Sequence, residues 1–132
     1  MDTAYSYIIK ARGISTEASY PYTKIYGSCK PSASKFTIQT WENSLGSNCD
    51  DLKRIVRKGP VSAAVGVGGD DWSSYYSGII STCSTGVNHA ILVTGFNSTT
   101  WTFKNSWGTR WSADGYGQLA MGNTCFICKY GG

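Results

Sequence analysis

Apolar residues recur along this chain at two different spacings. Over residues 1–12 they recur at helical spacing, and Gly13 follows as a helix stop. The pattern therefore predicts an amphipathic helix at the beginning of the sequence. Its apolar face holds Met1, Ala4, Tyr5, Ile8 and Ile9.

A second helix is predicted after a stretch of loop. Residues 13–35 carry the Gly, Pro, Ser and Thr punctuation of a loop. Further on, Ser47 and Asn48 cap the segment CDDLKRIVRK, and Gly59-Pro60 follows it. Acidic residues lie in the first turn of this segment and basic residues in its last, which is the charge order that a helix dipole favours.

Alternating apolar residues predict strands over most of the remaining chain. The pattern appears at FTIQTWE (36–42) and VSAAVGV (61–67), and again at 88–96 and 100–107, where a short turn makes a hairpin. The segment DDWSSYYSG (70–78) is predicted to be a turn with aromatic anchors. Together these elements indicate one compact, mostly β domain without repeats or a linker.

Composition limits the class of protein. The sequence has 132 residues, of which 41% are hydrophobic and 15% charged, so a folded domain is expected. The net charge is +4, and the one basic cluster (Lys53, Arg54, Arg57 and Lys58) is interpreted as the solvated face of a helix. Because no aromatic residues alternate with it, a nucleic-acid partner is not expected. No apolar run approaches 18 residues, so no membrane span is expected either.

Five cysteines and one histidine carry the chemistry of the sequence. The cysteines suggest an oxidising compartment, and their odd number leaves at least one thiol without a partner in the chain. His89 lies on a predicted strand, where a lone histidine is more often a core residue than a catalyst. Asn105 and Trp107 change this balance, because an amide oxygen can orient an imidazole and an indole can shield their hydrogen bond from water.

Ordered sequence blocks resemble one known family. The blocks are MDTAYSYI, GISTEASYPY, GPVSAAV, WSSYYSGII, VNHAILVTGF, WTFKNSWGTRWSADGYG and GNTC, and they run from Met1 to Cys125. They resemble the papain-like cysteine peptidases, cathepsin L-type members above all. The resemblance implies an α+β fold, namely the right-hand, β-barrel-like half of a papain-like domain with one helix remaining from the left-hand half. Residues 1–132 would form one partial domain, with 1–12 as that helix and 13–132 as the barrel half.

The resemblance also assigns catalytic roles. His89 would be the general base and acid, Asn105 its orienting residue, and Trp107 the cover over their hydrogen bond. The family's nucleophile signature lies so far before its histidine that the cysteine is expected roughly 40–60 residues upstream of Met1, together with the oxyanion-hole glutamine. A local substitute is disfavoured: by resemblance Cys83 would be one half of a disulfide, and the family's Trp-bearing helix does not follow Cys29, Cys49 or Cys128.

Two further implications concern cysteine pairing and specificity. Cys83 would pair with Cys125, tying the loop before the His89 strand to a C-terminal strand, and Cys29 would be unpaired. Cys49 and Cys128 could pair with each other, but sequence alone does not fix connectivity. A zinc site on Cys125-x-x-Cys128 is disfavoured by the single histidine and the lack of a second CxxC, so no metal or cofactor is expected. The walls of the specificity pocket would be Met1, Ala64, Val87, Ala90 and Tyr130, with Asn88 at its rim; the alternative is that these are core residues.

Some features depart from the family or are not explained by it. Phe126 stands where the family usually has Gly, and Ser112 replaces the Gly of a WG-x-x-WG run. Asn97-Ser98-Thr99 is a glycosylation sequon on an expected turn, consistent with a secretory route. By resemblance, the expected location is lysosomal, vacuolar or extracellular.

Two functions therefore remain open at the level of sequence. The first is the His/Asn-bearing part of a cysteine endopeptidase, inactive as this chain alone and completed by a nucleophile-bearing left-hand half that acts with it on peptide or protein substrates. The second is a non-catalytic pseudopeptidase that serves as a binding or structural subunit. In either case another polypeptide, the missing half or an assembly partner, is expected to cover the cleft face.

Overall fold

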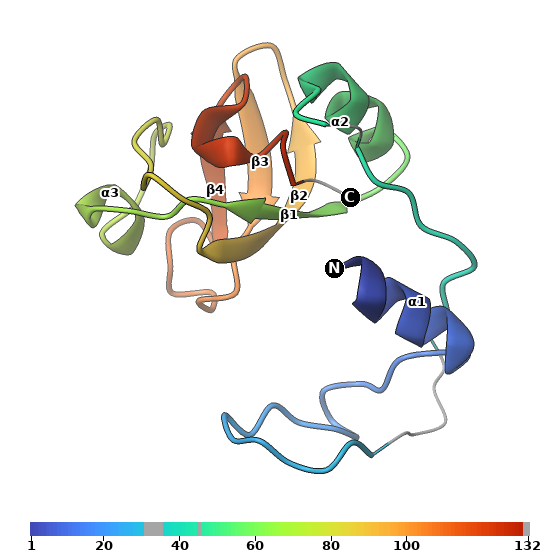
Figure 1. Cartoon of the computed structure of the whole chain (residues 1–132). Coiled ribbons are helices and arrows are strands. Elements are labelled where there is room, and N and C mark those ends of the chain that lie inside the picture. Colours follow the sequence, from blue (N-terminus) through green and yellow to red (C-terminus); the bar gives the residue numbers. More distant parts are fainter. Residues whose placement is uncertain (31–35, 45, 131–132) are drawn as a thin grey trace. The chain divides into compact units, whose positions relative to one another are not determined.

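The computed structural model of this chain describes residues 1–30, 36–44 and 46–130. The chain forms two compact units, Met1–Trp41 and Glu42–Gly132. Figure 1 follows both from the N-terminus to the C-terminus. The assignment of residues 1–132 to one partial domain, with 1–12 as a helix from the left-hand half and 13–132 as the barrel half, stays a prediction.

The first unit contains the predicted opening helix, α1 (Asp2–Lys10). None of its residues is buried, although Tyr5 stacks on Trp41 with ring centroids 6.2 Å apart. The loop predicted after it is confirmed for residues 15–30, which contain no helix or strand; its last part, 31–35, lies outside the described residues.

The strand predicted at 36–42 is wrong. Phe36 forms a single antiparallel bridge, in which the Ile14 amide donates to the Phe36 carbonyl at 3.0 Å, and 37–42 have no strand structure. Alternating apolar residues form a strand only where a neighbouring strand supplies backbone partners, and here only one bridge pair is present.

The second unit begins with the capped helix that the sequence predicts, α2 (Cys49–Val56). The side chain of Asn48 accepts hydrogen bonds from the amides of Asp50 and Asp51 at 3.0 and 3.3 Å, which satisfies two donors of the first turn. The helix buries Leu52, Ile55 and Val56 and packs against β2.

Three residues of the basic cluster on and just after α2, namely Lys53, Arg54 and Lys58, pair with acidic neighbours. Lys58 lies 2.7 Å and Arg54 3.2 Å from the same Glu42 oxygen, and Arg54 also contacts Asp51 at 2.8 Å. The hydrogen bond from Lys58 lowers the pKa of Glu42, and Arg54 adds to the effect. Glu42, Arg54 and Lys58 are exposed, which agrees with the interpretation of the cluster as a solvated helix face.

A four-stranded antiparallel sheet forms the centre of the second unit (Figure 1). Its strands are β1 (Val61–Val65), β2 (His89–Phe96), β3 (Thr100–Lys104) and β4 (Tyr116–Ala120), in that spatial order. The strand predicted at 61–67 and the hairpin predicted at 88–96 and 100–107 are confirmed, and with β4 and the helices they make an α+β fold. A register shift between Val93 and Gly95 bends the β2–β3 pair.

Two segments near the sheet adopt short helical turns. Where the sequence predicts a turn with aromatic anchors, α3 (Asp70–Ser73) forms one turn of helix and buries Trp72 completely. The strand expected around Cys125 is wrong, because Thr124–Phe126 is a 3-10 helix, η1. Cys125 and Phe126 have φ angles of 53° and 66°, which lie far from the extended backbone of a strand.

The core lies between α2, the sheet and η1. Its largest fully buried side chains include Trp72, Trp101, Phe103, Leu52, Leu119 and Ile127. Two disulfides cross it, Cys49–Cys128 and Cys83–Cys125, the second being the pair that the resemblance implies. Cys29 is a free, exposed thiol. No helix in the described part of the chain has the length and apolar character needed to cross a bilayer.

Candidate active site

The predicted imidazole and amide meet at one end of the β2–β3 hairpin. His89 is the first residue of β2, and Asn105 directly follows the last residue of β3. Because the two strands are antiparallel neighbours, the beginning of one lies beside the end of the other. The His89 Nε2 and Asn105 Oδ1 atoms lie 2.8 Å apart, within hydrogen-bond distance.

The surrounding backbone fixes which atoms face each other. The amide N–H of Ser106 points at the same Asn105 atom at 2.8 Å, and a backbone N–H can only donate. That atom is therefore the carbonyl oxygen, so the His89 Nε2 must carry the proton that it donates. A neutral imidazole with Nε2–H has its lone pair on Nδ1, which is the nitrogen left to accept a proton.

Asn105 is itself held in place. Its side chain is buried, with 7% of the residue exposed, and its backbone amide donates to the carbonyl of Gly115 at 2.8 Å. Its Nδ2 group is buried without a hydrogen-bond partner among the described residues. The side-chain oxygen of Asn105 thus accepts hydrogen bonds from both His89 and Ser106, which orients the imidazole. The side-chain NH₂ group is the buried donor that stays unsatisfied among the described residues.

Two indoles enclose the imidazole. The ring of Trp107 lies 5.0 Å from that of His89 between centroids, and Trp72 approaches it edge-on at 6.3 Å. Trp107 is 43% exposed, so it separates the imidazole from solvent on its own side while remaining at the surface. Trp111 joins the two indoles, since its Nε1 donates to the Trp72 carbonyl at 2.8 Å and its ring meets Trp107 edge-on.

The local sequence pattern does not predict the contact of Trp72 with His89. In the sequence, Trp72 is one aromatic anchor of a predicted turn and the first residue of the block WSSYYSGII, 17 positions before the histidine. The available signal was a large apolar residue in an otherwise polar segment. Its pairing with His89 depends on how α3 folds back against the sheet, and that information is not in the local pattern.

The free thiol of the chain belongs to the other unit. Four of the five cysteines form the two disulfides and cannot act as nucleophiles. Cys29 lies in the first unit, and its Sγ is 3.6 Å from the hydroxyl of Tyr7. This contact raises the pKa of the Tyr7 phenol. The unit that holds His89 therefore carries no thiol of its own.

Most residues predicted to form the specificity pocket lie near His89. Ala64 and Ala90 face each other in the β1–β2 register, and the Ala64 amide donates to the carbonyl of Tyr130 at 3.1 Å. Val87 precedes the strand and is exposed, as is Tyr130. Met1 belongs to the first unit, so its part in the pocket stays a prediction.

Asn88 has a definite structural task. Its side chain accepts a hydrogen bond from the Val67 amide and donates one to the Val67 carbonyl, both at 2.8 Å. The residue thereby fixes the chain just before His89 against the segment after β1. Its rim position in the predicted pocket stays a prediction.

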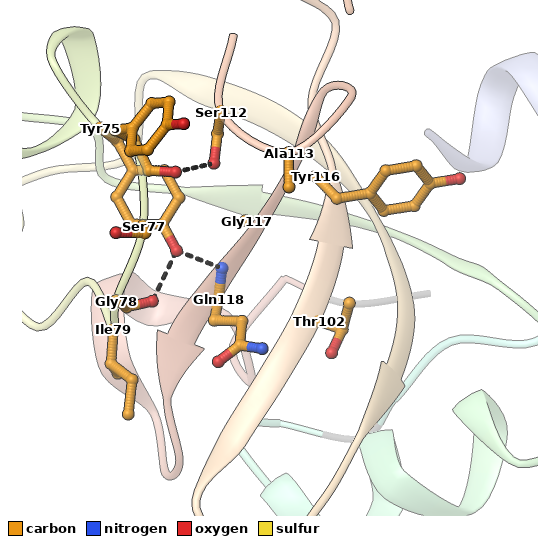
Figure 2. Close-up of a pocket in the computed structure, with 11 residues that line it drawn as sticks. Tyr75, Ser77, Gly78, Ile79, Thr102, Ser112, Ala113, Tyr116, Gly117 and Gln118 are labelled. Carbon is orange, nitrogen blue, oxygen red and sulfur yellow. Dashed lines mark hydrogen bonds between the residues drawn. The ribbon is translucent and has the colours of Figure 1, made fainter.

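A separate hollow of about 270 Å³ lies beside β4, with Tyr75 and the 76–79 loop on one side (Figure 2). The Tyr75 hydroxyl donates to the Gly78 carbonyl at 2.6 Å and accepts from the Gln118 amide at 3.2 Å, which closes the loop onto the strand. None of the predicted site residues lines it. Within the described ranges, no three His, Cys, Asp or Glu side chains gather in a way that could hold a metal ion.

Comparison with known proteins gives a consistent result. A family model described as papain family cysteine protease matches residues 1–131. Cathepsin L 2 of Paramecium tetraurelia is 33% identical over 129 residues, covering 97% of this chain and 40% of that protein. Cysteine proteinase COT44 of Brassica napus is 38% identical over 124 residues, covering 88% of this chain and 38% of that protein.

Solved structures agree with the sequence relatives. The bromelain protease from Ananas comosus, solved in complex with the E64 inhibitor, superposes with a TM-score of 0.84 at 29% identity. The match covers 97% of this chain and 65% of that one. The chain spans about 40% of the length of the curated relatives it matches, which are 40% and 38% covered.

Proposed function

The chain belongs to the papain family of cysteine proteases, and from this membership we propose that it is the His/Asn-bearing part of a cysteine endopeptidase. The observation that carries the proposal is the 2.8 Å contact between His89 Nε2 and Asn105 Oδ1. This contact leaves Nδ1 as the basic nitrogen of a half-buried imidazole, between two indoles.

The chemistry follows from that arrangement. Nδ1 of His89 takes the proton of a cysteine thiol, and the resulting thiolate attacks the carbonyl carbon of a peptide bond. The imidazolium then returns the proton to the departing amine, and a water molecule deprotonated by the same nitrogen hydrolyses the thioester. Asn105 keeps the ring in the orientation that both proton transfers need, and Trp107 limits the access of water to their hydrogen bond.

The nucleophile is proposed to come from another segment. No thiol in the unit of His89 is free, and the free thiol of Cys29 lies in the other unit. A nucleophile-bearing left-hand half, whether in the same precursor or on a separate chain, would complete the site. This chain alone is then expected to be inactive.

The residues beside His89 bear on the substrate, and the disulfides bear on the location. The apolar side chains of Ala64, Val87 and Ala90 beside His89 would favour a hydrophobic residue two positions before the cleaved peptide bond, and Tyr130 would shorten that pocket. Two disulfides in a small domain are typical of proteins that mature in an oxidising compartment. We propose a secretory route to a lysosomal, vacuolar or extracellular site.

The native protein, with whatever polypeptides accompany it, tests the proposal. We expect cleavage of peptide substrates and labelling of a cysteine outside these 132 residues by an epoxide affinity reagent. The His89→Ala variant should lose both, while the matched control Lys58→Ala, at an exposed residue just after α2, should keep both. Peptide binding without cleavage or labelling, unchanged by His89→Ala, would contradict the proposal and favour the pseudopeptidase alternative.

A further inference from the structure

The turn between β2 and β3 exposes the side chain of Asn97 to solvent. Asn97, Ser98 and Thr99 are all exposed, and their sequence is the only match to N-x-S/T in the chain. The candidate active site uses none of these residues. We propose that Asn97 is a site of N-linked glycosylation.

The hydrogen bonds of the turn favour this modification. Oδ1 of Asn97 accepts from the amides of Thr99 and Thr100, both at 2.8 Å, and from their hydroxyls at 3.0 and 3.1 Å. Because backbone amides only donate, the atom that faces the turn must be the carbonyl oxygen. Nδ2, on the other branch of the planar amide, is therefore directed away from the turn, and it makes no hydrogen bond among the described residues.

The modification would leave these contacts intact. In the transfer, Nδ2 forms a bond to the anomeric carbon of an oligosaccharide, the bond from that carbon to a lipid pyrophosphate breaks, and Nδ2 gives up one proton. The product amide keeps one N–H and an unchanged carbonyl oxygen. The four bonds to Oδ1 therefore survive, and the glycan extends from the side of the amide that has no protein partner.

The position is also compatible with the candidate active site. Asn97 follows the last residue of β2, whereas His89 is the first, so the two lie at opposite ends of one strand (Figure 1). At about 3.3 Å per residue, eight residues separate them by roughly 25 Å. A glycan on Asn97 would project from the far end of the hairpin and leave the surroundings of His89 open.

The covalent structure of the chain supports exposure to the enzymes that attach such glycans. Both disulfides indicate folding in an oxidising compartment, which is where N-linked oligosaccharides are added in secreted proteins. This support is independent of the proposed protease activity, because it would hold equally for a non-catalytic subunit.

Mass spectrometry of the native protein tests the proposal. After reduction of the Cys83–Cys125 disulfide, trypsin releases residues 59–104, in which Asn88 and Asn97 are the two asparagines. Enzymatic deglycosylation in H₂¹⁸O should convert Asn97, and not Asn88, to ¹⁸O-labelled Asp. Recovery of this peptide with Asn97 wholly unmodified would overturn the proposal.

Matched variants of the full gene product, expressed through a eukaryotic secretory pathway, separate the sequon from the turn. Asn97→Gln and Thr99→Ala should each remove one glycan and its mobility shift, whereas Thr99→Ser keeps a hydroxyl and should retain it. Because oligosaccharide transfer is read out by mass, the test does not depend on folding of the variants. A Thr99→Ala protein that differs from the parent only by the mass of the substituted side chain, with no loss of glycan mass, would refute the assignment.

Discussion

His89 and Ser106 share a single acceptor, the Oδ1 atom of Asn105, which lies 2.8 Å from each of their nitrogens. The Ser106 amide fixes the identity of that atom, and the atom in turn fixes the proton on the imidazole. A backbone N–H thus sets the tautomer of a side chain two contacts away. The tautomer decides whether the free ring nitrogen can act as a base toward a thiol.

This relationship gives a direct spectroscopic prediction. Because His89 is the only histidine in these 132 residues, its imidazole can be followed alone in ¹⁵N–¹H correlation spectra of this chain, and Nε2 should be protonated and Nδ1 unprotonated in the neutral form. Asn105→Ala should remove the preference for this tautomer and reduce kcat/KM of the complete enzyme by about 10²-fold, the lower end of what general acid–base catalysis contributes. A protonated Nδ1 in the parent protein would show that the pair is arranged differently.

A second prediction concerns the thiols. The native chain should react with one equivalent of a thiol reagent, at Cys29, because the other four cysteines are paired. This thiol should not be labelled by an epoxide affinity reagent, and Cys29→Ser should leave any native activity unchanged. Labelling of Cys29 that His89→Ala abolishes would instead identify it as the nucleophile.

A third prediction concerns the Cys83–Cys125 disulfide, which closes a loop with a sequence separation of 42. In the chain-entropy description, such a link destabilises the unfolded chain, and typical values are about 2–4 kcal/mol. The free energy of unfolding of the Cys83→Ala, Cys125→Ala double variant should therefore be lower by about 2–4 kcal/mol. The variant should unfold at a lower denaturant concentration than the parent. Non-reducing peptide maps that find both residues as free thiols would contradict it.

The elements with strong periodicity were predictable from the sequence. The cap at Asn48 and the alternating hairpin each satisfy their backbone groups locally, so local pattern is enough to specify them. The segment at 36–42 has the same alternation but only one bridge partner, and the sequence around it does not reveal which neighbour would be available. The 3-10 helix at 124–126 depends on left-handed backbone that a disulfide-bonded cysteine does not signal.

For the candidate site, sequence supplied the residues but not their atomic arrangement. Chemistry and resemblance singled out His89 and Asn105, whereas the role of the Ser106 amide and the contact with Trp72 required coordinates. The departures at Ser112 and Phe126 were visible as missing glycines. Their common cause was not: both positions have positive φ, 49° and 66°, where glycine meets no steric penalty.

Ser112 allows a fourth prediction in which two effects of similar size oppose each other. Its left-handed backbone costs about 1–2 kcal/mol relative to glycine, while its hydroxyl donates to the Tyr76 carbonyl at 2.9 Å, a bond that contributes about 1 kcal/mol. Ser112→Gly loses the bond and relieves the strain, so its stability should stay within about 1 kcal/mol of the parent. Ser112→Ala loses the bond alone and should be less stable than Ser112→Gly by about 1 kcal/mol or more in denaturant unfolding. The reverse order would contradict the backbone strain.

The fifth prediction concerns what covers the exposed apolar surface. Within the described part of the first unit, Gly13 alone is buried, α1 has no buried residue, and Tyr22, Ile25 and Tyr26 are largely exposed. In the second unit Val87, Trp107 and Tyr130 are also exposed, close to His89 in sequence or in space. Soluble monomers seldom expose apolar patches of more than about a few hundred Å².

The short helix α1 is the reason to expect that another polypeptide covers this surface. A helix of nine residues is marginal in water without tertiary packing, because isolated helices shorter than about 12–15 residues rarely persist. We therefore expect a second polypeptide segment, the nucleophile-bearing left-hand half, to pack against α1 and the surroundings of Trp107. Sedimentation of the native material should give a mass above the 14.3 kDa of this chain, and hydrogen exchange should show α1 protected. A stable 14.3 kDa monomer with a protected α1 would mean that the chain buries this helix by itself and would overturn the expectation.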